Sequence, residues 1–269
     1  MNINFNFLLI GTSLSLIPNL TRAQCAVTDC QQLGYTSLQK CDNGLKCPFG
    51  EYWACPKVEE KAVLGECTGY AKNCKIGDIL NSDGTCSSDK ISGKTPIGVV
   101  VYIGGDNCGQ ALSLKDLGGM YWSTEYIDIS GLPNYTSVSA LEQDFNSCDN
   151  TQKIIKQGTS GIYQAAWATV NYVPNSAPVT KSKWCLPAVG VARSMMNNYD
   201  KINSGLSKAG GELLPEPIVH NYWYWSSSEY SNNYAWVFCT NNGADWGGVN
   251  DYSKDYNSTS NVVRPVLAF

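Results

Sequence analysis

Twelve cysteines limit what this 269-residue chain can fold into more than any other feature. Zinc sites built from cysteine need CxxC-type pairs or histidine partners, but no two of these cysteines have that spacing and His220 is the only histidine. An even number of cysteines in an exported chain favours disulfide bonds instead. We therefore expect disulfides and neither a metal site nor a cofactor. The cysteines are Cys25, Cys30, Cys41, Cys47, Cys55, Cys67, Cys74, Cys86, Cys108, Cys148, Cys185 and Cys239.

The N-terminus has the pattern of a secretory signal peptide. Its apolar run, Phe5–Ile17, is too short to span a membrane as a helix, and Pro18 ends the run. Thr21 and Ala23 are small residues placed three and one before a cleavage after Ala23. No Lys or Arg precedes the run, which departs from the usual signal. We expect residues 1–23 to direct export, and a mature protein that is secreted or displayed at the cell surface without a transmembrane segment.

Residues 24–75 are rich in cysteine and lack apolar periodicity. Seven cysteines fall between Cys25 and Cys74, with Gly, Asp, Asn and Pro among them. Such a segment cannot bury enough apolar surface to fold by hydrophobic burial alone, so cross-links must hold it together. We predict a small disulfide-rich module or stalk, whose pairing the sequence does not determine. A spacer role is favoured over a toxin-like or inhibitory role.

The charge of the chain argues against nucleic acid as a partner. Charged residues make up 16% of the chain and the net charge is −4, whereas an average soluble protein has roughly 25% charged residues. No cluster of five or more Lys or Arg is present. The chain therefore lacks the basic patch with which proteins bind nucleic acid.

Residues 76–269 contain signals for both strands and helices, and we expect them to form one domain. The β-branched run Pro96–Ile103 lies between two turn signals and predicts a buried strand. From Pro187 onward, apolar residues recur every three or four positions, which predicts one long helix that Gly210 and Gly211 end. Shorter helices are expected at residues 137–145, 150–155 and 160–171.

The C-terminal residues 221–261 have the composition of a recognition surface. They hold eight Asn, six Tyr, seven Ser and four Trp. Tyr and Trp give a large contact area at little entropic cost, and Asn and Ser give adaptable hydrogen bonds. We predict a strand at Tyr234–Thr240, a hairpin turn at Asn242–Gly243, a return strand at Ala244–Val249, a polar loop at residues 250–260, and a closing strand at Asn261–Phe269 in which Pro265 marks an edge or a bulge.

Short motifs follow one another in this part of the chain: LPAVGV before the predicted helix, GG at its end, then YWSSSEY, YAW and a terminal VRPVLAF. Together they resemble the C-type-lectin-like domains of exported bacterial proteins, including the variable proteins of diversity-generating retroelements. The resemblance covers residues 76–269. It implies an α+β fold with two helices flanking small antiparallel sheets, paired N- and C-terminal strands, and a ligand surface on the last loops and hairpin.

The resemblance also divides the C-terminal residues into a variable surface and a scaffold. In the variable proteins, adenine-directed mutation enriches this stretch in Asn, Tyr, Ser and Asp, a composition that residues 221–261 share. The implied ligand-binding residues are Tyr230, Asn232, Asn233, Tyr234, Asn241, Asn242, Asp245, Trp246, Asn250, Tyr252 and Tyr256. The implied scaffold residues are Trp225, Ser226, Ser227, Glu229, Trp236, Arg264 and Pro265. We expect Arg264 to be a buried ion-pair partner of Glu229.

The sequence departs from the calcium-dependent and copper-dependent branches of this fold. Sugar-binding lectins use an EPN or QPD triplet and a later WND, whereas residues 216–218 read EPI and residues 249–251 read VND. Calcium requires several converging oxygen ligands, so we expect no calcium site. The formylglycine-generating branch needs a reactive thiol in a copper site, and the cysteines here are interpreted as structural.

The sequence favours a binding protein over an enzyme. A hydrolytic triad would have to use His220 with one of the serines at 226–228, but WSSSE lacks the glycines of a nucleophile elbow. We predict no catalytic residues and a ligand that is an extracellular protein or glycan. The alternative is a secreted enzyme that acts on polysaccharide. Its carboxylate pair would come from Glu212, Glu216, Glu229, Asp245 and Asp251, and their spacing selects no two of them.

Overall fold

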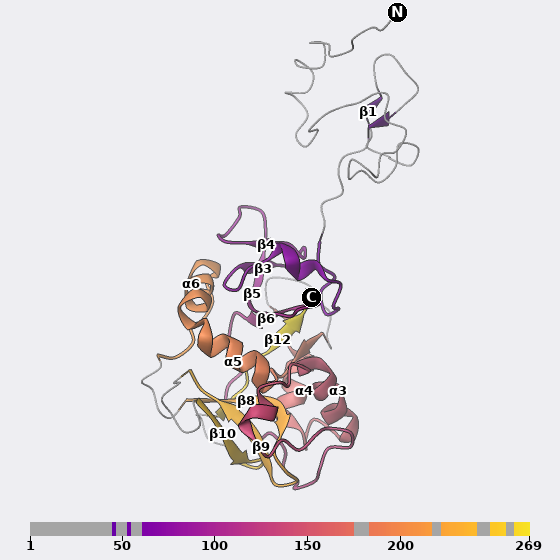
Figure 1. Cartoon of the computed structure of the whole chain (residues 1–269), viewed down its shortest axis with the longest axis vertical. Helices are drawn as coiled ribbons and strands as arrows, with labels where there is room; N and C mark the ends of the chain where they lie inside the picture. Colours follow the sequence, from indigo (N-terminus) through magenta and orange to yellow (C-terminus); the bar gives the residue numbers. More distant parts are fainter. Residues whose placement is uncertain are drawn as a thin grey trace, which may run out of the picture. The chain divides into compact units, whose positions relative to one another are not determined.

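The computed structural model places residues Lys61–Phe269 in one compact unit of mixed α+β structure, which confirms the predicted class (Figure 1). No helix among the described residues is long and apolar enough to cross a membrane. The predicted signal peptide and most of the predicted disulfide-rich module lie outside these residues. The structure describes residues 61–174, 183–216, 222–240, 248–256 and 261–269, together with two antiparallel strands of the N-terminal unit, β1 (Leu45–Lys46) and β2 (Trp53–Ala54).

The compact unit begins before the domain boundary that we predicted at residue 76. Residues 61–75 belong to it because two disulfides tie them to later parts of the chain. Cys67 is bonded to Cys108, and Cys74 is bonded to Cys86. A cysteine-rich composition marks a cross-linked segment but does not say where the partner cysteines lie.

A six-stranded antiparallel sheet has the strand order β4-β3-β5-β6-β12-β7. The β-branched run is β5, a strand with the predicted bounds whose first six residues are all buried. The C-terminal strand β12 lies between β6 and β7 rather than beside β3, so the described strands do not show the terminal pairing that the resemblance implies. The strands are β3 (Ile79–Asn81), β4 (Cys86–Ser87), β5 (Pro96–Ile103), β6 (Gly109–Ser113), β7 (Trp184–Cys185) and β12 (Val266–Ala268).

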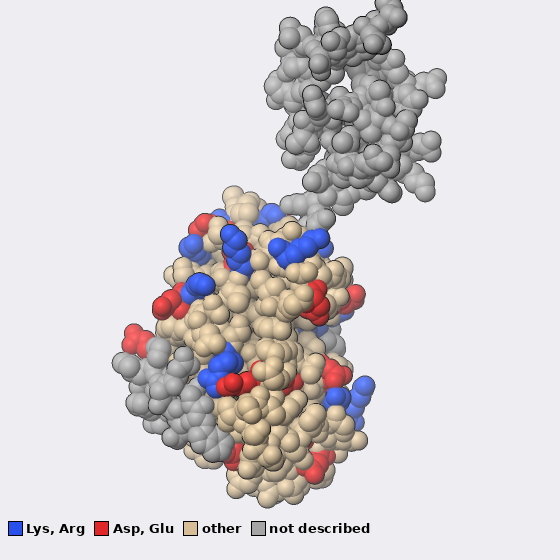
Figure 2. All heavy atoms as spheres, in the orientation of Figure 1, with Lys and Arg blue, Asp and Glu red and all other residues tan. Residues whose placement is uncertain are grey.

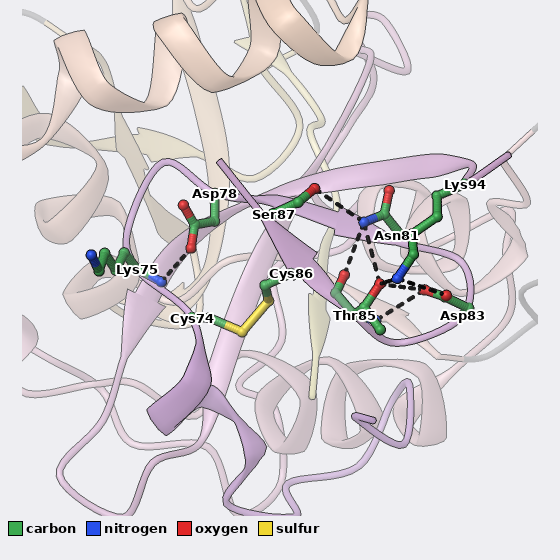
Figure 3. Close-up of a disulfide and its surroundings, with 9 residues drawn as sticks. All are labelled: Cys74, Lys75, Asp78, Asn81, Asp83, Thr85, Cys86, Ser87 and Lys94. Atoms are coloured by element: carbon green, nitrogen blue, oxygen red, sulfur yellow. Dashed lines mark hydrogen bonds and ion pairs between the residues drawn. A yellow bond between two sulfur atoms is a disulfide. The ribbon is translucent and has the colours of Figure 1, made fainter. Parts of the chain in front are cut away.

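The hairpin of β3 and β4 is held by a disulfide and, at its turn, by polar side chains (Figure 3). Cys86, the first residue of β4, is bonded to Cys74. The carboxylate of Asp83 accepts hydrogen bonds from the backbone N–H of Thr85 at 3.1 Å and from its hydroxyl at 2.7 Å. The ammonium of Lys94 lies 3.3 Å from the same carboxylate. These contacts fix the turn that the sequence signals here.

The described residues contain five α-helices, where the resemblance implies two. The helix predicted from Pro187 is in fact two helices, because Asn198 leaves the helical conformation with φ −123° and ψ 24°. The Asn198 amide donates to the Ser194 carbonyl at 3.0 Å, a local bond that competes with regular helix bonding. Gly210 ends the second helix as predicted, in the left-handed conformation at φ 77°. The helices are α2 (Val138–Leu141), α3 (Ser147–Gln157), α4 (Gln164–Asn171), α5 (Val189–Asn197) and α6 (Tyr199–Ala209), with a 3-10 turn η2 (Tyr70–Asn73).

The shorter predicted helices are present with different ends. Helix α3 begins at Ser147, so Asn150 and Thr151, where we expected the helix to start, lie inside it. Both residues are buried there, and the Thr151 hydroxyl donates to the Ser147 carbonyl at 2.7 Å. A disulfide from Cys148 to Cys185 joins α3 to β7.

A second sheet has the order β10-β9-β8-β11, with β11 parallel to β8 and the other pairs antiparallel. Strand β9 confirms the strand predicted from Tyr234, whereas β8 was not predicted. Most of the return strand predicted at residues 244–249 lies outside the described residues; within them, β10 runs from residue 249 to 253, into the predicted polar loop. The strands are β8 (Trp223–Glu229), β9 (Tyr234–Phe238), β10 (Val249–Ser253) and β11 (Asn261–Val262).

The predicted closing strand at Asn261–Phe269 is divided between the two sheets. Its first part is β11 and its last part is β12, and the chain changes sheet at Arg264 and Pro265. Pro265 has no N–H to offer to a ladder, but its carbonyl accepts from the Ser113 N–H at 2.8 Å. The residue that we read as an edge or bulge signal therefore marks a crossover.

Strand β8 is buried on both faces, so both faces of the second sheet are covered. Trp223 and Trp225 pack in one apolar cluster, and Tyr224 packs in the other. This alternation follows from the two-residue period of a strand. The indole N–H of Trp225 donates to the Met120 carbonyl at 2.8 Å. The sheet is thereby anchored on both sides, and its far end, where β8 turns into β9, has a fixed position.

Candidate ligand-binding surface

One end of the second sheet gathers three segments that are far apart in the sequence. The register of β9 and β10 places Ser253 beside Tyr234. The hydroxyl of Tyr126 lies 3.3 Å from that of Ser253, and the Ser123 N–H donates to the Lys254 carbonyl at 3.0 Å. We call these segments the tip; they are residues 123–132, 230–234 and 253–256.

The turn between β8 and β9 satisfies its own backbone. The N–H groups of Tyr230 and Ser231 both donate to the Tyr234 carbonyl at 3.1 Å. The Ser231 hydroxyl accepts from the N–H groups of Asn233 and Tyr234, each at 3.3 Å. Because these bonds close the turn internally, Asn232 and Asn233 remain exposed with amides that a ligand can reach.

Each segment of the tip exposes a large side chain. Tyr126 is 49% exposed and Ile127 is 45% exposed, while Tyr234 and Tyr256 are 40% and 45% exposed. Exposed aromatic side chains that occur together on a soluble domain mark interaction sites more often than single exposed residues do. Tyrosine also combines an apolar ring with a hydroxyl, which suits it to contacts with both protein and sugar.

Half-buried aromatic rings support two of these exposed side chains. The ring of Tyr234 meets Tyr230 edge-on at 6.4 Å, and Tyr230 meets the buried Trp236 at 5.4 Å. The ring of Tyr256 meets Tyr252 at 5.2 Å. Such ring pairs restrict side-chain motion, so these tyrosines are presented in defined orientations.

A buried ion pair lies beneath the tip and joins its three segments. The Lys254 ammonium contacts the Glu229 carboxylate directly, and both side chains are fully buried. The ammonium also donates to the Ile127 carbonyl at 2.8 Å, and the Ile129 N–H donates to Glu229 Oε2 at 3.1 Å. The Lys254 Nζ stands 4.8 Å from the centre of the Trp122 ring. The end of β8, the end of β10 and the 123–132 loop are therefore held by one charged cluster.

The two members of this pair have shifted pKa values for the same reason. Burial raises the pKa of Glu229 and lowers the pKa of Lys254, and the hydrogen bond and charge attraction between them oppose both shifts. Each residue thus relies on the other to stay ionised inside the protein. Loss of one partner leaves an uncompensated buried group.

Most of the predicted ligand-binding residues that the structure describes lie at the tip. Asn250 does not: it lies farther along β10, opposite Val237, and its side chain accepts from the Asp251 N–H at 2.9 Å. Asn250 and Tyr252 were predicted in a hairpin or loop, but both are in strand β10. The predicted residues at the tip are Tyr230, Asn232, Asn233, Tyr234 and Tyr256. Tyr252 lies just before the last segment of the tip, with its ring against Tyr256. Asn241, Asn242, Asp245 and Trp246 lie outside the described residues.

Sequence reasoning missed the 123–132 loop altogether. Tyr126 and Ile127 are exposed there between polar residues, and the one available signal was this apolar pair in the stretch STEYIDIS. Lys254 was also missed, because it is a single lysine in a stretch that we predicted to be a polar loop. Its role comes from burial, which composition does not reveal.

The inward orientation predicted for the scaffold residues is confirmed. The YWSSSE serines hold the N-terminal ends of two helices in place. The Ser228 hydroxyl donates to the Asp144 carboxylate at 2.7 Å and accepts from the Val189 N–H of α5 at 3.2 Å, and Asn150 of α3 donates to the same carboxylate at 2.8 Å. The buried scaffold residues are Trp225, Ser226, Ser227, Glu229, Trp236, Arg264 and Pro265.

The predicted ion pair between Arg264 and Glu229 is wrong. The Arg264 guanidinium lies 3.2 Å from the Asp116 carboxylate and donates to the Ser113 and Glu212 carbonyls at 3.1 and 2.7 Å. Arg264 is at the crossover between the sheets, whereas Glu229 ends β8 beneath the tip. Glu229 and Arg264 are close in the sequence, but this proximity did not reveal that their side chains bond to different partners.

Among the described residues, one group has the composition of a metal site, Cys67, Asp106 and Cys108, and it lies outside the tip. Its two cysteines are bonded to each other, so they are not thiolate ligands. Glu229 is sealed beneath the surface by Lys254, where no substrate reaches it.

No protein-family model and no curated protein matches this sequence. Among solved structures, the chain is similar to a fimbrial protein from Bacteroides ovatus ATCC 8483, with a TM-score of 0.49 and 16% sequence identity. The match covers 73% of this chain and 49% of that one, so this chain spans about half of that protein's length. A likeness at this level implies no shared ligand, partner or assembly.

Proposed function

We propose that this chain is an exported ligand-binding protein with a C-type-lectin-like domain, whose tip binds an extracellular protein or glycan. One observation carries the proposal: Tyr126, Tyr234 and Tyr256 are exposed on three separate segments, and the buried pair of Glu229 and Lys254 clamps those segments together. Rigid tyrosines beside asparagines have the chemistry of binding loops. A surface that is ordered before binding loses less entropy when the ligand arrives.

Two further features support the export and the fold in this proposal. Disulfides persist in oxidising compartments, and the compact unit contains three of them, Cys67–Cys108, Cys74–Cys86 and Cys148–Cys185. The motif order from LPAVGV to VRPVLAF supports the C-type-lectin-like assignment, because the scaffold residues that it implies are buried.

The proposal is tested by screening the full chain against an array of extracellular proteins and glycans. Alanine at Tyr126, Tyr234 or Tyr256 should weaken binding to the captured ligand about tenfold or more, which corresponds to ~1.4 kcal/mol for a central interface tyrosine. Matched controls are Ile91→Ala and Leu213→Ala, which remove exposed apolar side chains outside the tip. Equal losses in the tip and control variants would refute the proposed surface.

We propose that binding takes place without turnover. The enzyme alternative predicts that the captured ligand, if a polysaccharide, is cleaved, and that Glu212→Gln or Glu216→Gln abolishes the cleavage. The binding proposal expects an unchanged ligand by mass spectrometry after prolonged incubation, and it expects affinity to fall in the tyrosine variants alone. A cleaved ligand would decide for the enzyme.

From the resemblance to diversified proteins, we separately propose that the codons for residues 221–261 are diversified. If residues 221–261 are diversified, a near-copy of their codons that differs only at adenines should lie beside a reverse transcriptase gene. Sequencing of the surrounding DNA tests this directly. An isolated gene without such a copy would leave an ordinary C-type-lectin-like binding domain.

A further inference from the structure

We infer that the ligand of the tip is a protein segment that presents Lys or Arg side chains. This inference rests on the proposed function and adds the chemistry of the partner. The tip combines three exposed tyrosines with exposed carboxylates, and its one basic side chain is buried. An acidic protein or an acidic glycan would meet repulsion on such a surface, whereas a basic segment would meet complementary charge.

The charge balance of the tip follows from the sequence of its segments. In residues 116–137 and 218–263, the only Lys or Arg is Lys254. Its ammonium is fully buried against Glu229, so it offers no positive charge to a ligand. The exposed acidic residues are Glu125, Asp128 and Asp255.

The view in Figure 2 agrees with this balance. The lower end of the molecule, where Figure 1 places β9 and β10, shows scattered red among tan and no blue. Lys153 of α3 approaches the loop at Gly131, but its ammonium is paired with Asp149 at 2.7 Å. Of these two lysines, Lys254 is therefore buried and Lys153 is already paired.

Asp255 is positioned to receive a cation. Hydrogen bonds from Ser253 and Tyr126 hold its pKa below the usual value, so it is charged at neutral pH. Its side chain is exposed, and carboxylate oxygens accept more than one hydrogen bond. A guanidinium or ammonium can therefore pair with Asp255 while it remains bonded to Ser253.

Asp128 supplies a second carboxylate on the same loop as Tyr126. It accepts from the Asn134 amide at 3.2 Å, which orients it, and it is exposed. Tyrosine faces attract cations at distances within about 6 Å of the ring centre, and arginine does this most often. Exposed rings interleaved with carboxylates thus favour a basic peptide over a neutral one.

The test uses the full chain with tyrosine rings labelled for NMR and three probes: a hexapeptide of alternating Gly and Arg, the same peptide with Glu for Arg, and a neutral N-acetylglucosamine oligomer. The Arg peptide should shift the ring signals of Tyr126, Tyr234 and Tyr256, and the Glu peptide should not. Asp128→Asn and Asp255→Asn should each weaken Arg-peptide binding about threefold to tenfold. Raising the salt concentration should weaken it as well.

Asp89→Asn is the matched control, because Asp89 is an exposed aspartate outside the tip that pairs with Lys208 at 2.9 Å. It should leave Arg-peptide binding unchanged. If the neutral oligomer shifts the three rings and the Arg peptide does not, the partner class is wrong while the tip remains a binding surface. The inference is overturned if the Arg peptide shifts none of the three ring signals, or if it binds the Asp89→Asn variant as weakly as it binds the tip variants. The array experiment tests the proposed function separately.

Discussion

At the residue scale, Glu229 and Lys254 decide whether the tip exists as one surface. Both are fully buried, and each bonds to the backbone of the 123–132 loop as well as to the other. A buried pair of this kind contributes little net stability relative to well-packed apolar residues, but its geometry is specific. The pair therefore serves to hold three segments in register more than to stabilise the fold.

Replacing one member of the Glu229–Lys254 pair should lower the free energy of unfolding far more than replacing both. Lys254→Met leaves the Glu229 carboxylate buried without its cation, and we expect unfolding in urea to show a loss of about 3–5 kcal/mol. Glu229→Gln combined with Lys254→Met should recover most of this loss, because Gln still accepts from the Ile129 N–H. Lys153→Met, which breaks an exposed pair with Asp149, should cost no more than about 1 kcal/mol. A double variant as unstable as Lys254→Met would contradict this account.

Asp255 should titrate below an ordinary aspartate because of its two hydrogen-bond donors. Its folded pKa is lowered by Ser253 and then by Tyr126, so it favours folding above the unfolded pKa and loses this contribution as the pH falls through the folded value. Ser253→Ala and Tyr126→Phe should each raise the pKa, measured by NMR of the labelled carboxyl carbon. Identical titration curves for wild type and both variants would show that these bonds do not form in solution.

At the scale of elements, the sequence pattern predicted those helices and strands that local interactions determine. The run at Pro96–Ile103 was predicted correctly because a strand buried along most of its length reads as one apolar stretch. The helix predicted after Pro187 is present, but its division at Asn198 was not predicted, because a single polar residue within a periodic apolar pattern does not indicate where a helix ends. Strand β8 was missed because its serines are buried, and Ser228 bonds to Asp144 and Val189, which are distant in the sequence. No local pattern encodes such contacts.

Because α6 packs closely on the first sheet, we expect a glycine-to-alanine change in this helix to destabilise the protein, although helix propensity alone predicts stabilisation. Alanine favours a helix interior over glycine by about 1 kcal/mol. A Cβ at Gly205, however, would lie 2.2 Å from the Gly77 carbonyl and 2.8 Å from the Val99 side chain. We therefore expect Gly205→Ala to lower the free energy of unfolding by about 1–3 kcal/mol. Thermal unfolding of both variants measures this change. Ser207→Ala, on the exposed side of the same helix, should be neutral or slightly stabilising in that measurement. A stabilised Gly205→Ala would mean that α6 does not pack this closely.

At the scale of the whole molecule, the candidate site depends on contacts that sequence distance conceals. The composition of the C-terminal stretch indicated a recognition surface and the resemblance implied its individual residues, several of which do meet at the tip. The 123–132 loop was not predicted, because Tyr126 meets Ser253 across 127 positions of the chain. Arg264 was assigned the wrong partner for the same reason: its carboxylate partner, Asp116, lies shortly after β6, far from Arg264 in the sequence. Composition thus pointed to one part of the candidate site, and the fold brings the other part, the 123–132 loop, beside it.

A disulfide should stabilise the compact unit more when it closes a longer stretch of chain, although the gain rises only with the logarithm of that length. Cys148–Cys185 closes a sequence separation of 37 and Cys74–Cys86 a separation of 12, for which loop-closure entropy gives about 4 and about 3 kcal/mol. Paired Cys-to-Ser variants of the full chain, unfolded in urea under non-reducing conditions, should follow this order. Helix α3, which the longer link joins to β7, also contacts β8, because the Asn150 amide donates to the Ser227 hydroxyl at 3.4 Å. The variant without Cys148–Cys185 should therefore lose binding at the tip at lower urea concentration than the variant without Cys74–Cys86. If the two variants lose binding and fold at the same concentration, loop length does not govern the stability of this domain.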